Sequence, residues 1–285
     1  MADSTAQTHP ADKFIEVKGL RLHYLDFGGD GRPWLVCVHG LSGNAHNFDQ
    51  IAASLSRRYH LLSVDVRGRG DSAWGPPTEY LPKYYVEDLA AILERVGIAR
   101  TTLVGTSMGG IISMMYAGGW PERVERLVLN DIGPDIDPAG AARIGGYMGI
   151  APERFNDIGE VAGYYRKTYP AMTNMPEEKL RDSVKWSVKP LDGGGLGWKI
   201  DPTIRRPIRG ATAQQRPDLW VPFARIACPI LVIRGADSDI LSQRTAAQMK
   251  TMHTGVTVVE VPGVAHAPSL TEPEAASALA KFLAL

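Results

Sequence analysis

The sequence predicts an α/β fold, in which helices flank a mostly parallel sheet of eight strands and a helical insertion interrupts the pattern. Short apolar runs rich in Val, Ile and Leu alternate with segments of helical period, as in a parallel sheet buried on both faces. This alternation stops in one long stretch of the second half. The chain has 285 residues, 44% of them hydrophobic, which is enough for a large core.

The expected sheet starts with a hairpin, because residues 14–17 and 20–27 alternate apolar and polar side chains around Gly19. Six buried strands follow at residues 34–38, 61–66, 102–105, 127–129, 230–233 and 256–261. Helices are expected between them at residues 48–57, 83–96, 108–117 and 274–282, the last of which follows Pro273.

Residues 134–222 are rich in Gly, Pro, Met and aromatic side chains and show no strand pattern. Amphipathic pieces at 139–148, 158–168 and 177–188 precede a loop-like run at 191–197. A long loop is uncommon in a compact domain, so we expect a helical cap domain here. The core then comprises residues 1–133 and 223–285, with 1–13 as a loose tail.

Charge and composition exclude several classes of partner. The 31 Lys and Arg residues balance 31 Asp and Glu, so the chain lacks the field that nucleic-acid and anionic-membrane binders use. No apolar run approaches the roughly 18 residues of a membrane span, and no targeting segment is expected. Cys37 and Cys228 lie in apolar runs and are expected to be buried thiols. These features predict a cytoplasmic protein and leave its oligomeric state open.

A candidate nucleophile lies in the run Gly105-Thr106-Ser107-Met108-Gly109, which reads G-x-S-x-G. The run joins an expected strand to an expected helix, which is the context that gives the pattern meaning. The two glycines leave room for a tight turn, and the helix directs its amides and positive dipole end toward Ser107.

A serine hydroxyl needs a base, and histidine has a suitable pKa. His266 lies in a Gly- and Pro-rich loop after the last strand, from which it can reach Ser107, so we expect it to be the general acid and base. His39 is expected to brace a loop. Surface or structural roles are expected for the remaining candidates His9, His23, His60 and His253.

The base needs a carboxylate to orient it. Asp237 and Asp239 follow the strand at 230–233, so either of them is placed at the carboxyl edge of the sheet. The order Ser, Asp, His along the chain is that of α/β-hydrolases.

Over residues 14–285 the chain resembles serine enzymes of the α/β-hydrolase fold. The motifs that carry this resemblance are HGLS at 39–42, DVRGRGDS at 65–72, the Ser107 turn, RGADSDIL at 234–241 and GVAHAP at 263–268. In related sequences the fourth of these often reads RGxxSDxL, which favours Asp239 over Asp237. The resemblance also implies an oxyanion hole formed by the amides of Leu41 and Met108. Asp65, Arg67 and Asp71 are expected to fix loops.

The resemblance implies hydrolysis of a small carboxylic ester through an acyl-serine, without a cofactor. Lactone hydrolysis and cleavage of a carbon-carbon bond in a vinylogous diketone use the same residues and remain alternatives. A non-catalytic receptor of the same fold that binds a small ligand is a further alternative. Ser107 argues against dehalogenases and epoxide hydrolases of this fold, which use an aspartate. No H-E-x-x-H motif is present, and no metal site is expected.

Substrate choice is expected to come from the cap, whose aromatic and Met side chains favour a substrate with an apolar part. Five residues are candidates for the wall of the pocket, namely His46, Tyr147, Met148, Trp186 and Trp198.

Overall fold

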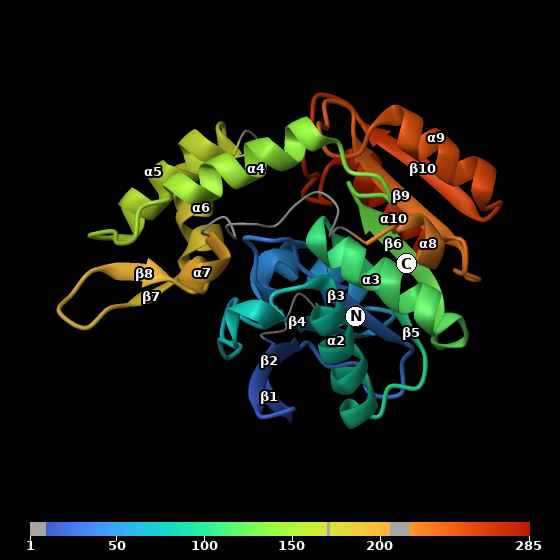
Figure 1. The fold of residues 1–285 in the computed structure, drawn as a ribbon, viewed down its shortest axis with the longest axis horizontal. Coiled ribbons are helices and arrows are strands. Elements are labelled where there is room, and N and C mark those ends of the chain that lie inside the picture. Colours follow the sequence, from blue (N-terminus) through green and yellow to red (C-terminus); the bar gives the residue numbers. More distant parts are fainter. Residues whose placement is uncertain (1–9, 170–171, 206–216) are drawn as a thin grey trace, which may run out of the picture.

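A computed structural model describes residues 10–169, 172–205 and 217–285 (Figure 1). Its main feature is an eight-stranded sheet in the order β1-β2-β4-β3-β5-β6-β9-β10. The expected α/β fold and the expected eight strands are both confirmed. The strands are β1 Ala11–Val17, β2 Leu20–Asp26, β3 Trp34–Val38, β4 His60–Val64, β5 Thr101–Thr106, β6 Val124–Asn130, β9 Ile230–Gly235 and β10 Val256–Val261.

The hairpin of β1 and β2 joins the edge of the sheet. The two strands pair antiparallel from Ala11 with Asp26 to Val17 with Leu20, and β2 then pairs antiparallel with β4. Gly19 allows the tight turn between them, because its φ of +80° lies in the left-handed region. Because β1 begins at Ala11, residues 11–13 belong to the sheet, which corrects the expectation of a loose tail there.

The other strands run parallel, so their carboxyl ends lie at one edge of the sheet. Successive side chains point to opposite faces, as Leu103 and Val104 of β5 show by packing in different core clusters. The helices α2 and α3 cover one face together with α9, and α1 and α10 cover the other. These helices are α1 Asp49–Leu55, α2 Pro82–Val96, α3 Met108–Gly119, α9 Gln243–Met252 and α10 Pro273–Leu283.

We call residues 134–222, between β6 and β9, the insertion. Most of its elements lie together beside the sheet, and α4 extends from this group toward β9 and β10 (Figure 1). Its elements are α4 Pro138–Ile150, α5 Ile158–Thr168, α6 Glu177–Val184, β7 Val188–Pro190, β8 Leu196–Trp198, α7 Pro202–Arg205 and α8 Trp220–Phe223. The last of them, α8, packs on α3.

The insertion also contains strands, which the sequence pattern did not predict. β7 and β8 pair antiparallel from Val188 with Trp198 to Pro190 with Leu196. Three consecutive glycines, Gly193 to Gly195, all have positive φ and form the turn between them. Strands of three residues are too short to show a period, so the run at 191–197 resembled a loop.

Polar contacts fasten the insertion to the rest of the chain. The hydroxyl of Tyr80 donates to Asp201 at 2.6 Å, and the Lys199 ammonium lies 2.6 Å from the Asp71 carboxylate. At the end of the insertion nearest β6, Gly140 approaches the backbone of Asp239 so closely that a Cβ atom would lie 2.0 Å from its carbonyl oxygen. Close backbone packing therefore fixes α4 over the loop after β9.

Cys37 and Cys228 are free and buried, as expected. Burial raises the pKa of Cys37 far above its usual value and that of Cys228 to about 11, so both remain protonated thiols. Within the described ranges, no helix combines the length and the apolar character that crossing a membrane would require.

Two adjacent glycines at the end of α3 give a matched test of this packing. A Cβ atom at Gly118 would lie 2.2 Å from the carbonyl oxygen of Pro222, whereas one at Gly119 would meet nothing within 4 Å. We expect Gly118→Ala to lower the free energy of unfolding by about 1–3 kcal/mol, because α8 must move away. Gly119→Ala should leave it unchanged or raise it by up to about 1 kcal/mol. Urea denaturation measures both, and equal effects would contradict the packing described.

Candidate active site

The site lies at the carboxyl edge of the sheet, where two neighbouring strands end in register. Thr106 at the end of β5 pairs with Asn130 at the end of β6. The residues after the two strands, Ser107 and Asp131, therefore start the two following segments side by side. The Ser107 amide donates to the carbonyl of Asn130 at 3.0 Å. The loop after β10 returns across β9 to the end of β6, where the Asn130 side chain donates to the Pro268 carbonyl at 2.8 Å. This return brings His266 above the ends of both strands.

Ser107 occupies a strained turn between β5 and α3. Its φ of +52° and ψ of −118° lie in a region that residues with a side chain rarely adopt. A Cβ atom at Gly105 would lie 2.5 Å from the Gly109 carbonyl oxygen, and one at Gly109 would lie 2.0 Å from that of Val38. Only glycine fits at either position, and this explains the spacing of the G-x-S-x-G run.

His266 connects the serine to a carboxylate. Its Nε2 lies 2.9 Å from the Ser107 Oγ, and its Nδ1 lies 2.8 Å from the Asp131 Oδ2. An ionised carboxylate only accepts hydrogen bonds, so the Nδ1 must carry the proton and donate it to Asp131. The Nε2 of the neutral ring is then free to accept from the serine hydroxyl.

The carboxylate of Asp131 is completely buried and accepts hydrogen bonds on both oxygens. Oδ1 accepts from the Gly235 amide at 3.0 Å, and Oδ2 accepts from the Ser238 hydroxyl at 2.6 Å as well as from His266. The Asp131 amide donates to the Ile233 carbonyl at 2.7 Å. These contacts fix the carboxylate between the ends of β6 and β9.

The structure corrects the expected acid. Asp239 does not contact His266; its carboxylate instead forms a two-pronged ion pair with Arg143 of α4, with Nη2 2.7 Å from Oδ1. The hydrogen bond from Arg143 lowers the pKa of Asp239. The alternative, Asp237, is exposed at the same loop. Asp131 was missed although it lies two residues after the expected strand at 127–129, because the resemblance at 234–241 favours a carboxylate after the neighbouring strand.

The residues expected to form the oxyanion hole lie beside the serine. Met108 is the first residue of α3, so its amide has no carbonyl one turn earlier. A Cβ atom at Gly40 would lie 3.6 Å from the Ser107 Cβ, which places the peptide of Gly40 and Leu41 next to the nucleophile. The buried Arg69 guanidinium donates to the Leu41 carbonyl at 3.1 Å and contacts the Met108 sulfur at 3.4 Å. It thereby supports both residues.

His39 braces the loop after β3, as expected. Its Nδ1 donates to the Gly40 carbonyl at 2.7 Å, and its Nε2 accepts from the Val66 amide at 3.0 Å. Burial lowers its pKa to about 4, so the ring stays neutral. His9 lies outside the described residues.

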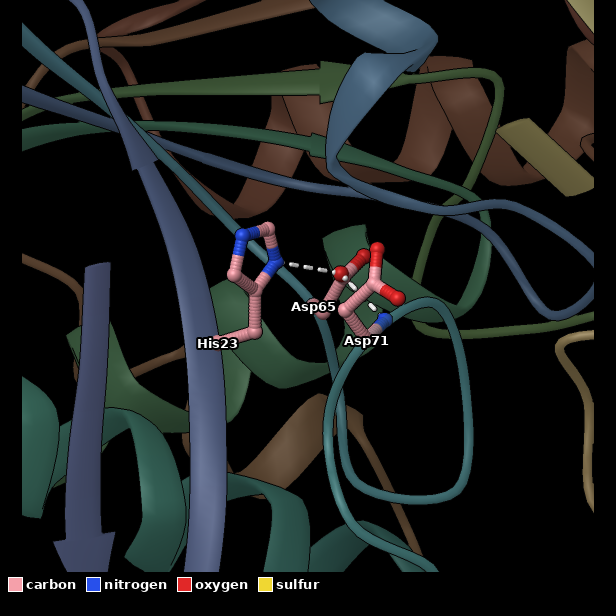
Figure 2. Close-up of side chains that lie close together, drawn as sticks. All are labelled: His23, Asp65 and Asp71. Atoms are coloured by element: carbon pink, nitrogen blue, oxygen red, sulfur yellow. Dashed lines mark hydrogen bonds and ion pairs between the residues drawn. The ribbon is translucent and has the colours of Figure 1, made fainter. Parts of the chain in front are cut away.

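A second cluster lies away from the serine and consists of His23, Asp65 and Asp71 (Figure 2). The Asp65 carboxylate accepts from the His23 ring at 2.6 Å and from the amides of Ala45 and Asp71 at 2.7 and 2.9 Å. The lone pairs of the Asp65 carboxylate thus already accept hydrogen bonds, and a metal ion could bind there only by displacing these donors. The cluster ties the β2 strand to the loops before η1 (Ala45–Phe48) and after β4, which is the structural role expected for Asp65.

A cavity of about 520 Å³ lies next to His266 and is walled by the insertion and the loop after β9. Of the five expected pocket residues only Tyr147 lines it. Trp198 and Met148 are buried instead, and the Trp198 indole donates to the Pro152 carbonyl. His46 and Trp186 stack on each other with ring centroids 3.8 Å apart. The lining is also more charged than expected and consists of Arg143, Tyr147, Ile150, Lys167, Thr168, Asp237, Asp239 and Ala265.

The strand order and the Ser107 turn are those of an α/β-hydrolase fold. Residues 35–279 match the model of the Alpha/beta hydrolase family, and the chain belongs to that family. A 3-hydroxybutyrate-oligomer hydrolase of Cupriavidus necator is 36% identical over 262 residues, 89% of each protein. A 2-(acetamidomethylene)succinate hydrolase of Mesorhizobium japonicum is 27% identical over 96% of this chain and 95% of its own. A crystal structure of an alpha/beta hydrolase from Novosphingobium aromaticivorans superposes with a TM-score of 0.87 at 35% identity, over 96% of this chain and 98% of its own.

The His23 cluster predicts a pH-dependent contribution to stability. Burial alone would lower the pKa of His23, but hydrogen bonds to Asp65 and Asp12 and the Asp65 charge together raise it above its ordinary 6.5. A group with a raised pKa stabilises the fold fully below its unfolded pKa and loses that effect as the pH rises through the folded pKa. We therefore expect His23→Gln to lower the Tm more at pH 6 than at pH 8.5.

Thermal unfolding of both proteins across this range measures the difference. The other histidines are identical in the two proteins, so their titration cancels. A Tm difference that stays constant with pH would show that His23 acts through packing alone.

Proposed function

We propose that this chain is a serine hydrolase that cleaves a small carboxylic ester through an acyl-serine, with Ser107, His266 and Asp131 as its triad. One observation carries the proposal: a continuous hydrogen-bonded series runs from the Ser107 hydroxyl through both ring nitrogens of His266 to the buried Asp131. In this proposal the Ser107 hydroxyl donates to Nε2, and Nδ1 donates to the Asp131 carboxylate.

In the first half-reaction the Ser107 Oγ attacks the ester carbonyl carbon while the His266 Nε2 takes the hydroxyl proton. The ring becomes an imidazolium, which the Asp131 carboxylate stabilises through Nδ1. When the tetrahedral intermediate collapses, the carbon–oxygen bond to the alcohol breaks, and Nε2 gives its proton to that oxygen. Water then attacks the acyl-serine with His266 again as the base, which releases the acid and restores Ser107.

The amides of Leu41 and Met108 would hold the oxygen anion of each tetrahedral intermediate. Such donors help most when they are fixed before the reaction, and a single lost donor costs on the order of 100-fold to 1,000-fold in rate. The contacts of Arg69 with both residues support this role. In the same proposal the insertion serves as the cap, because it supplies five of the cavity-lining residues from α4 and α5, including Tyr147.

An ester is favoured over the other substrates because the Cupriavidus necator relative is named for oligomers of a hydroxy acid, which are joined by ester bonds. The same triad chemistry applies to lactones and vinylogous diketones, so these become outcomes of the substrate tests below. A receptor that only binds a ligand would need neither the strained turn at Ser107 nor a hydrogen bond between its hydroxyl and His266, so both features favour an enzyme.

The first prediction concerns the nucleophile. Ser107→Ala should reduce hydrolysis of p-nitrophenyl esters from acetyl to lauroyl by about 10⁴-fold or more, because no acyl-enzyme can form. A phosphonate ester should add its mass to the native chain at Ser107 and not to the variant. Folded wild-type protein that gains mass but turns over none of these esters would exclude a general esterase and favour lactone or diketone cleavage, whereas protein that neither turns over an ester nor gains mass would overturn the serine-hydrolase proposal and leave ligand binding.

The second prediction separates the two candidate acids. Asp131→Asn should lower kcat by about 10⁴-fold with little change in KM, since an amide stabilises neither the required tautomer nor the imidazolium. Asp239→Asn is the matched control, with the same change of charge one strand away. It should retain kcat within about tenfold on a neutral ester. The reverse ranking would restore Asp239 as the orienting acid.

A further inference from the structure

Two of the residues that line the charged cavity lie close to catalytic segments of the chain. Ala265 directly precedes His266. The ring of Tyr147, a second lining residue, packs edge-on against Tyr169, with centroids 5.2 Å apart, and the Tyr169 hydroxyl lies 3.1 Å from that of Ser42. Ser42 follows Leu41, whose amide is proposed to hold the oxyanion. One arm of an ester bound at Ser107 therefore has this cavity next to it.

Four ionisable side chains other than tyrosine line the cavity, and two of them neutralise each other. Arg143 and Asp239 form the ion pair described above. This pairing uses Nε and Nη2 of Arg143 and leaves Nη1 without a hydrogen bond among the described residues. Among the lining residues, Asp237 is the anion whose side chain has no partner within the described ranges, and it is exposed.

Lys167 is a lining cation without a partner for its ammonium among the residues that the structure describes. It lies one residue before the end of α5 and is exposed. Tyr147 adds a neutral donor, because burial raises its pKa to about 12 and keeps the hydroxyl protonated. Lys167, Nη1 of Arg143 and the Tyr147 hydroxyl thus offer donors in one cavity, against a single unpaired carboxylate.

We propose that this cavity is a subsite for a carboxylate, and that Lys167 selects ester substrates carrying an anionic group on the arm that it receives. The inference rests on the proposed function and deepens it by naming the substrate class. An ammonium recognises a carboxylate as a point charge and a hydrogen-bond donor. The Asp237 carboxylate repels the same anionic ligand. Removing the charge of Lys167 and removing that of Asp237 should therefore change the preference for a carboxylate in opposite directions.

The test compares esters that differ only in that charge. One pair carries the group in the acyl part, namely the mono-4-nitrophenyl ester of adipic acid and its primary amide. A second pair carries it in the alcohol part, namely 3-butanoyloxybutanoate and its primary amide. An amide has nearly the shape of a carboxylate and adds no second ester, so the ratio of kcat/KM within a pair isolates the charge.

For at least one pair we expect wild-type protein to prefer the carboxylate by about fivefold to tenfold, a range typical of a partly exposed ion pair with charge-assisted hydrogen bonds. Lys167→Gln should abolish this preference, and Asp237→Asn should increase it. Lys179→Gln is the matched control, because Lys179 is an exposed lysine of α6 outside the cavity lining and its loss changes the net charge equally. It should keep the wild-type ratio.

Binding to Ser107→Ala tests the subsite without turnover. Isothermal titration should show tighter binding of the carboxylate ester than of its amide, and Lys167→Gln added to this variant should remove the difference. Equal ratios in wild-type and Lys167→Gln protein, or a preference for the amides, would overturn the subsite while Ser107-dependent hydrolysis still stood. Absence of all hydrolysis would overturn the proposed function, and the titration would still decide the subsite.

Discussion

The carboxylate of Asp131 is the group on which the arrangement of the site depends. A carboxylate withdrawn from water is stable only if donors replace the water. Here the donors come from the Gly235 amide, the Ser238 hydroxyl and the His266 ring. These belong to the end of β9, the loop that follows it and the loop after β10, so satisfying one buried group aligns three segments. The position of the imidazole over Ser107 follows from that alignment.

Most of the fold was predictable, because buried strands appear in the sequence as apolar runs and half-buried helices as apolar residues at helical spacing. The expected strand at 256–261 and the expected helix at 158–168 coincide with β10 and α5. The hairpin of β7 and β8 was missed because three-residue strands show no period. The first strand was predicted too short, since residues 11–13 are exposed and polar or small although they pair with β2.

The site was predictable where the chemistry is local and not where it depends on neighbouring strands. Gly105 and Gly109 flank Ser107 in the sequence itself, and the loop of His266 follows a clear strand. Which carboxylate meets the imidazole depends on how the loop after β10 crosses the sheet, and no residue spacing records that. Asp131 lies two residues after the expected strand at 127–129, so a list of the acidic residues near every strand end includes it. Lys167 lacks any sequence signal, because a lysine near a helix end is ordinary.

The placement of the buried carboxylate directly after β6 has a consequence for how this protein can diverge. Asp239 holds Arg143 rather than the imidazole, so the loop after β9 contributes a connection to the insertion and only Ser238 to the support of Asp131. The loop after β9 thus carries two cavity-lining residues, Asp237 and Asp239, on either side of Ser238, which supports Asp131. If the cavity selects the ligand as proposed, changes at Asp237, Asp239 or Arg143 would alter that choice without removing a hydrogen-bond partner of His266. Relatives that keep one reaction while exchanging substrates would be expected to vary at these positions first.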